Sequence, residues 1–149
     1  MSRRALARIA GALWCVGSLA LFTRSASLFR IARDTEQRST AVLWLAIGAG
    51  LAIGAAKGWF VLRKTAARNL LRIGSLGEPT RPWQAFPPAF YPLIAVMIGM
   101  GVGIRMLAAR GLPGGHLTAL AVYVAIGAAL LGSSMPYWRF TGPSDQRGA

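Results

Sequence analysis

Four apolar stretches dominate the sequence, and arginine-rich segments separate them. The stretches cover about residues 5–23, 41–62, 89–109 and 117–135. A helix needs roughly 20 apolar residues to cross the hydrocarbon of a bilayer, and each stretch reaches or approaches that length. All the acidic residues lie between or after the stretches: Asp34, Glu36, Glu78 and Asp145. The pattern predicts an all-α integral membrane bundle of four transmembrane helices, with a basic amphipathic extension after the second helix.

The composition favours a membrane protein over a soluble domain. Hydrophobic residues make up 54% of the chain and charged residues only 14%, which leaves too little polar surface to cover a soluble fold. Residues 1–140 are expected to form a single transmembrane domain, followed by a short polar tail at 141–149. The net charge of +13 is better explained by topology signals and contacts to anionic lipids than by nucleic-acid binding, because the arginines flank apolar stretches.

Basic residues are distributed unevenly around the stretches. If the N-terminus is inside, the cytoplasmic segments hold ten arginine and lysine residues and the outer segments hold five. The positive-inside rule then predicts a multi-pass protein of a bacterial inner membrane with both termini in the cytoplasm. Four of the outer arginines fall in the loop expected after the first stretch: Arg24, Arg30, Arg33 and Arg38. Tryptophans expected near the two membrane interfaces agree with this orientation: Trp44, Trp59, Trp83 and Trp138.

The first stretch also has the outline of a secretory signal peptide. Arginines precede it, and the small residues Ser25-Ala26-Ser27 would suit a peptidase. Cys15, the only cysteine, follows Trp14, whose bulk argues against a lipoprotein site. We expect an uncleaved first helix, in which Arg8 extends to the headgroups; cleavage near residue 28 is the alternative.

The segment after the second stretch is the most distinctive functional candidate. Four of its basic residues recur at helical spacing, namely Lys57, Lys64, Arg68 and Arg72. Arg63 lies next to Lys64. An apolar stripe runs along the same predicted helix: Trp59, Leu62, Ala66, Leu70 and Ile73. The helix either prolongs the second span or bends along the cytoplasmic leaflet. We expect a lipid-facing positive surface, with docking of an acidic partner or a specific lipid as the sharper alternative.

Lys57 and Arg105 are charges within apolar stretches, which is by default a hint of function. Each lies near its own membrane interface, so we expect both to extend to the headgroups. Lining an anion path and contacting loop carbonyls are the alternatives.

Small residues recur at spacing four in three of the stretches. The sets are Ala46, Gly50, Gly54 and Gly58; Gly99 and Gly103; and Ala121, Ala125 and Ala129. Such stripes allow helix backbones to approach closely and predict helix packing at each of them.

The sequence offers no catalytic, cofactor-binding or metal-binding constellation, and no cofactor is expected. His116, the only histidine, lies in a turn-like loop and is expected to be interfacial, with proton sensing as the alternative. Ser133 and Ser134 are expected to bond back to helix carbonyls. The run Gly99-Met-Gly101-Val-Gly103 lacks the strand–turn–helix setting of a phosphate loop. An enzyme acting on lipid is the least favoured function.

Several short motifs connect this chain to a known group of proteins. They are Lys57-Gly-Trp-Phe-Val-Leu-Arg-Lys64, Arg72-Ile73, Tyr91-Pro-Leu-Ile94, Met100-Gly101-x-x-Ile104-Arg105 and Gly127-x-Ala-Leu130. Through them, residues 40–138 resemble a family of small, uncharacterised bacterial inner-membrane proteins with about four spans. The resemblance implies the topology and supplies no mechanism.

The predicted function is therefore non-enzymatic. The protein would act through anionic lipids, or through a membrane-protein partner or a second copy of itself, and would use the basic segment 57–72. The alternative is a transporter or channel subunit for a small solute or anion, with Arg105 or Lys57 along the path.

Overall fold

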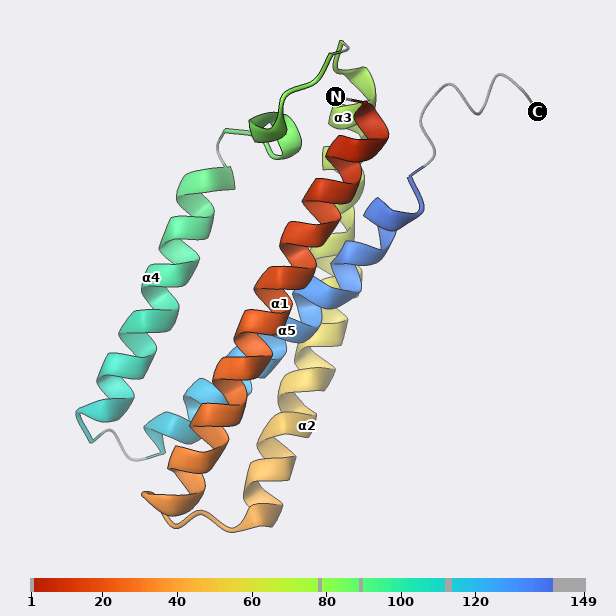
Figure 1. Ribbon diagram of the computed structural model, residues 1–149. Helices are drawn as coiled ribbons and strands as arrows, with labels where there is room; N and C mark the ends of the chain where they lie inside the picture. The colour runs from red at the N-terminus through yellow and green to blue at the C-terminus, as the bar shows by residue number, and fades with distance from the viewer. Residues whose placement is uncertain (1, 78, 89, 112–113, 141–149) are drawn as a thin grey trace.

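Helices account for all the regular structure in the computed structural model, which describes residues 2–77, 79–88, 90–111 and 114–140. The elements, shown in Figure 1, are α1 (Arg3–Asp34), α2 (Thr40–Lys57), η1 (Gly58–Leu62), α3 (Arg63–Ser75), η2 (Pro82–Ala85), α4 (Phe90–Ala109) and α5 (Gly115–Trp138). Within the described ranges, three helices are long and apolar enough to cross a membrane: α1, the continuous helix Thr40–Ser75, and α5. The all-helical prediction is confirmed, whereas a fourth span at α4 stays a prediction.

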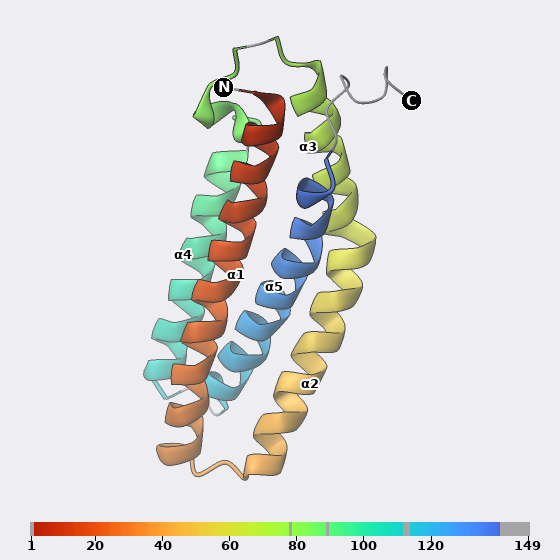
Figure 2. The ribbon, with the colours of Figure 1, turned by 45° about the vertical axis from the view of Figure 1, so that its right-hand side comes forward.

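The helix α5 is the centre of the bundle. It packs along α1 and α2, and it is also the main neighbour of α4. Figure 1 shows α5 running obliquely behind α1, from the lower end of α4 toward α3, and Figure 2 shows it between α1 and α2. Every long helix therefore buries a face against α5, and the residues that allow close approach to α5 determine the fold.

The helices α2 and α5 meet at small residues. A β-carbon added at Gly50 would lie 2.7 Å from the Ala121 carbonyl oxygen, and one at Gly58 would lie 3.0 Å from the Ala129 carbonyl oxygen. At Gly54 it would overlap the carbonyl of Ala125. The glycine stripe of α2 and the alanine stripe of α5 thus face each other backbone to backbone, a contact whose dispersion energy lipid tails cannot replace.

A different repeat joins α1 to α5. Buried small residues recur seven apart along α1: Gly11, Ser18, Ser25 and Ala32. A second buried series lies between them: Ala7, Trp14 and Leu28. The alternating steps of three and four form the seam typical of left-handed helix pairs. The Ser18 hydroxyl donates a 2.8 Å hydrogen bond across this seam to the Gly127 carbonyl.

The helix α1 continues well past its predicted end at residue 23. Leu28 and Ala32 are buried in an apolar cluster with Leu43 and Leu120, and residues 24–34 contain neither glycine nor proline to stop a helix. The prediction of a loop holding Arg24, Arg30 and Arg33 is therefore wrong. These exposed arginines lie on α1, and only residues 35–39 connect it to α2.

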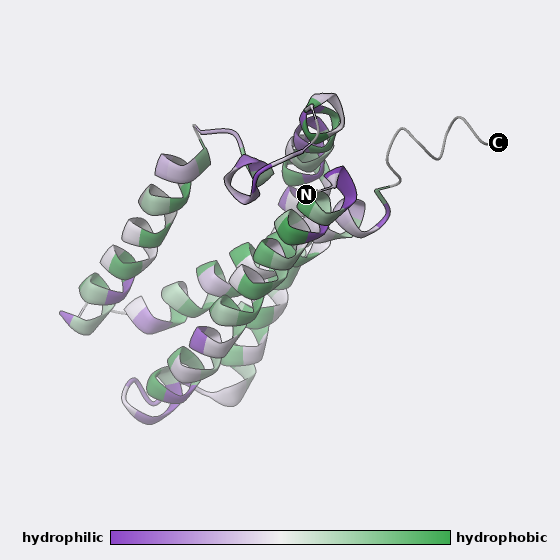
Figure 3. Ribbon diagram, turned by 45° about the horizontal axis from the view of Figure 1, so that its top comes forward, coloured by the Kyte–Doolittle hydropathy of each residue, from purple (hydrophilic) through white to green (hydrophobic). Residues whose placement is uncertain are grey.

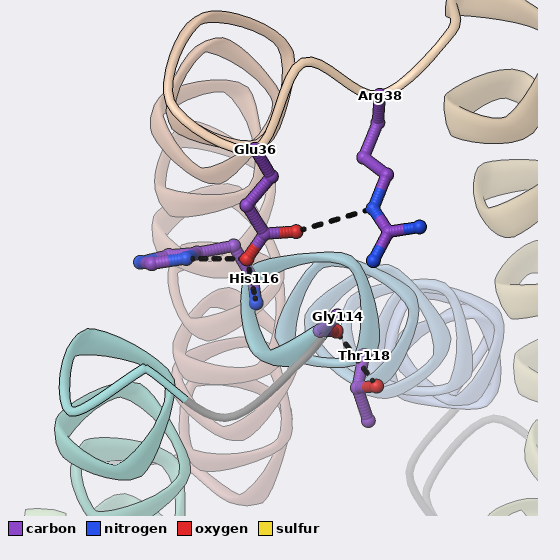
Figure 4. Close-up of polar contacts among 5 residues, drawn as sticks. All are labelled: Glu36, Arg38, Gly114, His116 and Thr118. Carbon is purple, nitrogen blue, oxygen red and sulfur yellow. Dashed lines mark hydrogen bonds and ion pairs between the residues drawn. The ribbon is translucent and has the colours of Figure 1, made fainter.

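Glu36 closes this end of the bundle by capping another helix (Figure 4). The first residues of α5 have no side-chain cap of their own, since the N-cap is Gly114. Glu36 Oε1 accepts hydrogen bonds from the His116 backbone N–H at 3.1 Å and from His116 Nδ1 at 2.8 Å. Its Oε2 faces Arg38 Nε at 3.6 Å. A carboxylate in this position suits the positive end of the helix dipole.

The small residues of α4 pack differently from the prediction. A β-carbon added at Gly99 or Gly103 would meet no atom within 4 Å, whereas one at Gly101 would lie 3.2 Å from Tyr123 Oη. Tyr123 Oη also donates a 3.0 Å hydrogen bond to the Gly101 carbonyl. Residues two positions apart lie on nearly opposite faces of a helix. The predicted packing at Gly99 and Gly103 is therefore wrong within this chain, and Gly101 makes the contact instead.

Polar residues gather at the two ends of the bundle, and apolar residues lie along the middle of the helices (Figure 3). The start of α1, α3, η2 and the end of α5 share one end, which we call the basic end. Two exposed tryptophans, Trp83 and Trp138, lie on elements of this end, and a third, Trp59, lies on η1 just before α3. Trp14, in contrast, is buried there among Leu6, Ala66 and Tyr137.

Candidate functional site

The segment 57–72 prolongs the second helix, which is the first of the two predicted alternatives. A single π-helical turn, η1, links α2 to α3, and in it the Arg63 N–H donates to the Gly58 carbonyl. The wider turn accommodates one extra residue and so rotates the following helix by about 100°. On α3, Ala66, Asn69 and Ile73 face the bundle. Ala66 and Ile73 belong to the predicted apolar stripe, whereas Trp59, predicted to begin it, is 64% exposed.

The predicted basic face divides into an exposed part and an inward part. Lys57, Arg63, Lys64 and Arg68 are exposed. The Arg63 guanidinium lies 4.3 Å from the centre of the Trp59 ring, which is a cation–π arrangement. Arg72 is half-buried and turns toward the bundle, so the four spaced basic residues do not act as one surface.

Arg72, Asn69 and Tyr137 form a hydrogen-bonded network at the basic end. Arg72 donates from Nε and Nη2 to Asn69 Oδ1, both at 3.2 Å, and from Nη2 to the Gln84 carbonyl. Asn69 Nδ2 donates to the Ala85 carbonyl at 2.8 Å and to Tyr137 Oη at 3.2 Å. Asn69 is only 6% exposed, so these bonds replace the water lost on burial. The network ties α3 to η2 and to the end of α5.

A pocket of about 280 Å³ lies beside this network. Arg68, Arg72 and Tyr137 supply much of its polar lining, with Thr65 and Asn69. Phe90 supplies part of the apolar lining, and its ring stacks on those of its fellow lining residues Phe86, at 5.0 Å, and Trp14, at 6.2 Å. None of the described lining residues is acidic. Although polar residues are among those that line it, the surface of the pocket is largely apolar, so it suits a hydrophobic group.

The two charges predicted to lie within apolar stretches do not meet inside the bundle. Lys57 on α2 and Arg105 on α4 are both exposed, and no described ion pair or hydrogen bond involves either of them. The structure therefore does not place these two residues along an interior path. Both have the exposure expected of side chains that extend to an interface.

Sequence reasoning missed Asn69, Tyr137 and Trp14 as parts of a site. Asn69 lies three residues after Ala66 and four before Ile73, so a polar residue interrupts the buried stripe of α3. A polar residue within a buried stripe is a usable signal of a site, but it can be recognised only once the buried face of α3 is known. Nothing in the sequence indicates that Trp14 and Tyr137, at opposite ends of the chain, line the same pocket.

No group of three or more histidine, cysteine, aspartate or glutamate side chains gathers among the described residues. Ser133 and Ser134 donate their hydroxyl hydrogens to the carbonyls of Ala129 and Leu131. No family model, curated protein sequence or solved structure matches this chain. The resemblance to four-span bacterial membrane proteins therefore stays a prediction, and function has to be inferred from the residues and their geometry.

Proposed function

We propose that this protein is a non-enzymatic, multi-pass protein of a bacterial inner membrane that binds anionic lipids at a basic, cytoplasmic end. The carrying observation is the exposed positive surface of α3, formed by Arg63, Lys64 and Arg68, on a helix that directly continues α2. At 1.5 Å per residue the 36-residue helix Thr40–Ser75 is about 54 Å long, against roughly 30 Å of hydrocarbon. With α2 in the hydrocarbon, α3 extends through the headgroup layer.

The aromatic residues support this depth. Trp59, on η1 just before α3, and Trp138, at the end of α5, are 64% and 54% exposed, and exposed indole rings favour the boundary between hydrocarbon and headgroups. The basic residues of α3 follow Trp59 along the chain and therefore lie on its headgroup side. A basic side chain near an anionic leaflet contributes about 1 kcal/mol, so the exposed set would enrich anionic lipid around this end.

The transporter alternative requires Lys57 or Arg105 to line a path. Both side chains are exposed in the chain, and no described contact directs them toward each other. We therefore put forward lipid binding alone.

The test uses the full-length protein extracted in mild neutral detergent and measures the anionic fraction of the phospholipid that remains bound. We expect this fraction to exceed that of the source membrane and to fall as salt is raised. The double variant Arg63→Gln, Lys64→Gln should lose the enrichment. The matched control Arg30→Gln, Arg33→Gln removes two exposed charges from the opposite end and should keep it. Equal anionic fractions in all three proteins would overturn the proposal.

A further inference from the structure

Several polar residues that line the pocket have their polar atoms engaged within the protein. Asn69 donates from Nδ2 to Tyr137 Oη and accepts at Oδ1 from Arg72. Thr65 donates its hydroxyl hydrogen at 3.3 Å to the Val61 carbonyl of the preceding turn. These bonds account for a pocket whose surface is largely apolar although polar residues line it.

Aromatic rings form the inner wall of the pocket. The Trp14 ring is stacked on that of Phe90 at 6.2 Å and lies 6.1 Å from that of Tyr137, and all three residues line the pocket. Trp14 and Tyr137 are only 4% and 1% exposed, whereas Arg68, another lining residue, is exposed. The pocket therefore leads inward from the surface, between walls that come from α1, α3, α4 and α5.

The pocket lies at the depth proposed for the boundary between hydrocarbon and headgroups. Tyr137 directly precedes Trp138, whose exposed indole ring favours that boundary. A cavity of about 280 Å³ left empty would deprive its lining of dispersion contacts, and an apolar cavity does not hold ordered water. The apolar material available at this depth of a bilayer is the hydrocarbon of the lipids.

We propose that the pocket binds one alkyl chain of a membrane lipid, whose first methylene groups lie against Trp14 and Phe90. An apolar cavity of about 150 Å³ is enough to bind benzene, so a pocket of about 280 Å³ has room for a segment of a single chain. Lipid would thereby become part of the packing between the start of α4 and the bundle. The proposal rests on the proposed membrane placement of the basic end, and it concerns the tail of the lipid rather than its charge.

The test measures contact between a lipid chain and Trp14 in a bilayer. The other four tryptophans, Trp44, Trp59, Trp83 and Trp138, are exposed, so each can be replaced by phenylalanine with little loss of packing. The full-length protein that retains Trp14 alone is placed in phosphatidylcholine nanodiscs, with or without bromine in the upper part of one acyl chain. Bromine quenches indole fluorescence only near contact. Because Trp14 is 4% exposed, a chain has to enter the pocket to quench it.

A second protein, which retains only the exposed Trp138, provides the reference. We expect brominated lipid to quench Trp14 and Trp138 to a similar extent. Quenching of Trp138 alone, as for an empty pocket or one filled by another protein segment, would overturn the proposal and leave the membrane placement intact. Absence of quenching at both residues would overturn that placement as well. Phosphatidylcholine carries no net charge, so the result is independent of the anionic lipid binding proposed above.

A variant that fills the pocket separates the entry of a chain from any other exposure of the ring. In the protein with Trp14 alone, Thr65→Phe adds bulk to a lining residue and should remove most of the quenching. Thr65→Val keeps the size of the side chain and should leave the quenching unchanged. Equal quenching in all three proteins would show that bromine reaches Trp14 by another route and would overturn the pocket as the binding site. The comparison of Trp14 with Trp138 alters no lining residue, so it decides the proposal even if Thr65→Phe fails to fold.

Discussion

Gly54 marks the place where α2 and α5 leave no room for a side chain. Its α-carbon faces the Ala125 carbonyl, and Gly50 and Gly58 make similar contacts one turn to either side. Gly48, on the same helix, has no neighbouring atom within 4 Å of an added β-carbon. The two glycines thus share a helix and a residue type and differ in what surrounds them.

Alanine substitutions at these positions should have effects of opposite sign. Gly54→Ala forces α2 away from α5 and should lower the free energy of unfolding by about 1–3 kcal/mol, as overpacking of a core does. Gly48→Ala should raise it by up to about 1 kcal/mol, because glycine is the poorer helix former. Thermal unfolding of both variants in one detergent measures this. Shifts of the same sign would contradict the packing.

Glu36 makes the stability of the opposite end depend on pH. Burial acts to raise the pKa of Glu36, but the hydrogen bonds from the His116 ring and backbone N–H, with nearby positive charge, outweigh it and lower the pKa below its ordinary value. The folded state therefore favours the carboxylate. This contribution is complete above the pKa of an unfolded glutamate and is lost as the pH falls through the lowered value.

Melting temperatures between about pH 3 and 6, around the ordinary glutamate pKa of about 4.3, test this linkage. Wild type should lose stability toward the acid end, and Glu36→Gln should show a flatter dependence together with a lower melting temperature at pH 6. Asp34→Asn removes an exposed carboxylate nearby and should retain the wild-type profile. A Glu36→Gln profile parallel to wild type would show that the pair with His116 does not stabilise the fold.

Among the helices, α4 is attached chiefly through its contact with α5. Gly101 provides this contact, with Tyr123 bonded to its carbonyl, while Gly99 and Gly103 face away from the other helices. The orientation of α4 thus depends in part on Tyr123 and on the absence of a side chain opposite it, together with the stacking of Phe90 on Trp14.

Leucine substitutions along α4 should reveal this orientation. Gly101→Leu would displace Tyr123 and should lower the melting temperature, whereas Gly99→Leu and Gly103→Leu, two residues to either side, should leave it near the wild-type value. Greater destabilisation at Gly99 or Gly103 would mean that the opposite face of α4 is the packed one.

The limits of sequence-based prediction are clear from these same elements. The stripe at Gly50, Gly54 and Gly58 was recognisable because close helix packing requires small residues at a fixed period. The seam on α1 has a seven-residue period that a search at spacing four does not detect. The choice between Gly101 and its neighbours depends on where Tyr123 lies. Trp59 is exposed and Asn69 is buried, the opposite of what their polarity suggests, and no local residue pattern predicted the π-turn at Gly58–Leu62 that precedes α3.

On the scale of the whole molecule, the distribution of charge predicts an orientation in the membrane. The start of α1 and the end of α5 lie at the basic end together with α3, and the loop 35–39 lies at the opposite end. The positive surface of α3 would meet the anionic lipid of the inner leaflet only if the basic end faces the cytoplasm. Orientation in the membrane is therefore the central claim, and it can be measured directly.

Two single-cysteine variants report the two ends. Cys15 is the only cysteine, so Ser75→Cys and Thr35→Cys are each made in a Cys15→Ser background; both sites are exposed, and neither requires the positive φ found at Gly114. We predict that an impermeant maleimide labels Thr35→Cys in intact spheroplasts and labels Ser75→Cys only after the membrane is opened. Labelling of Ser75→Cys in intact spheroplasts, with Thr35→Cys protected, would contradict the account.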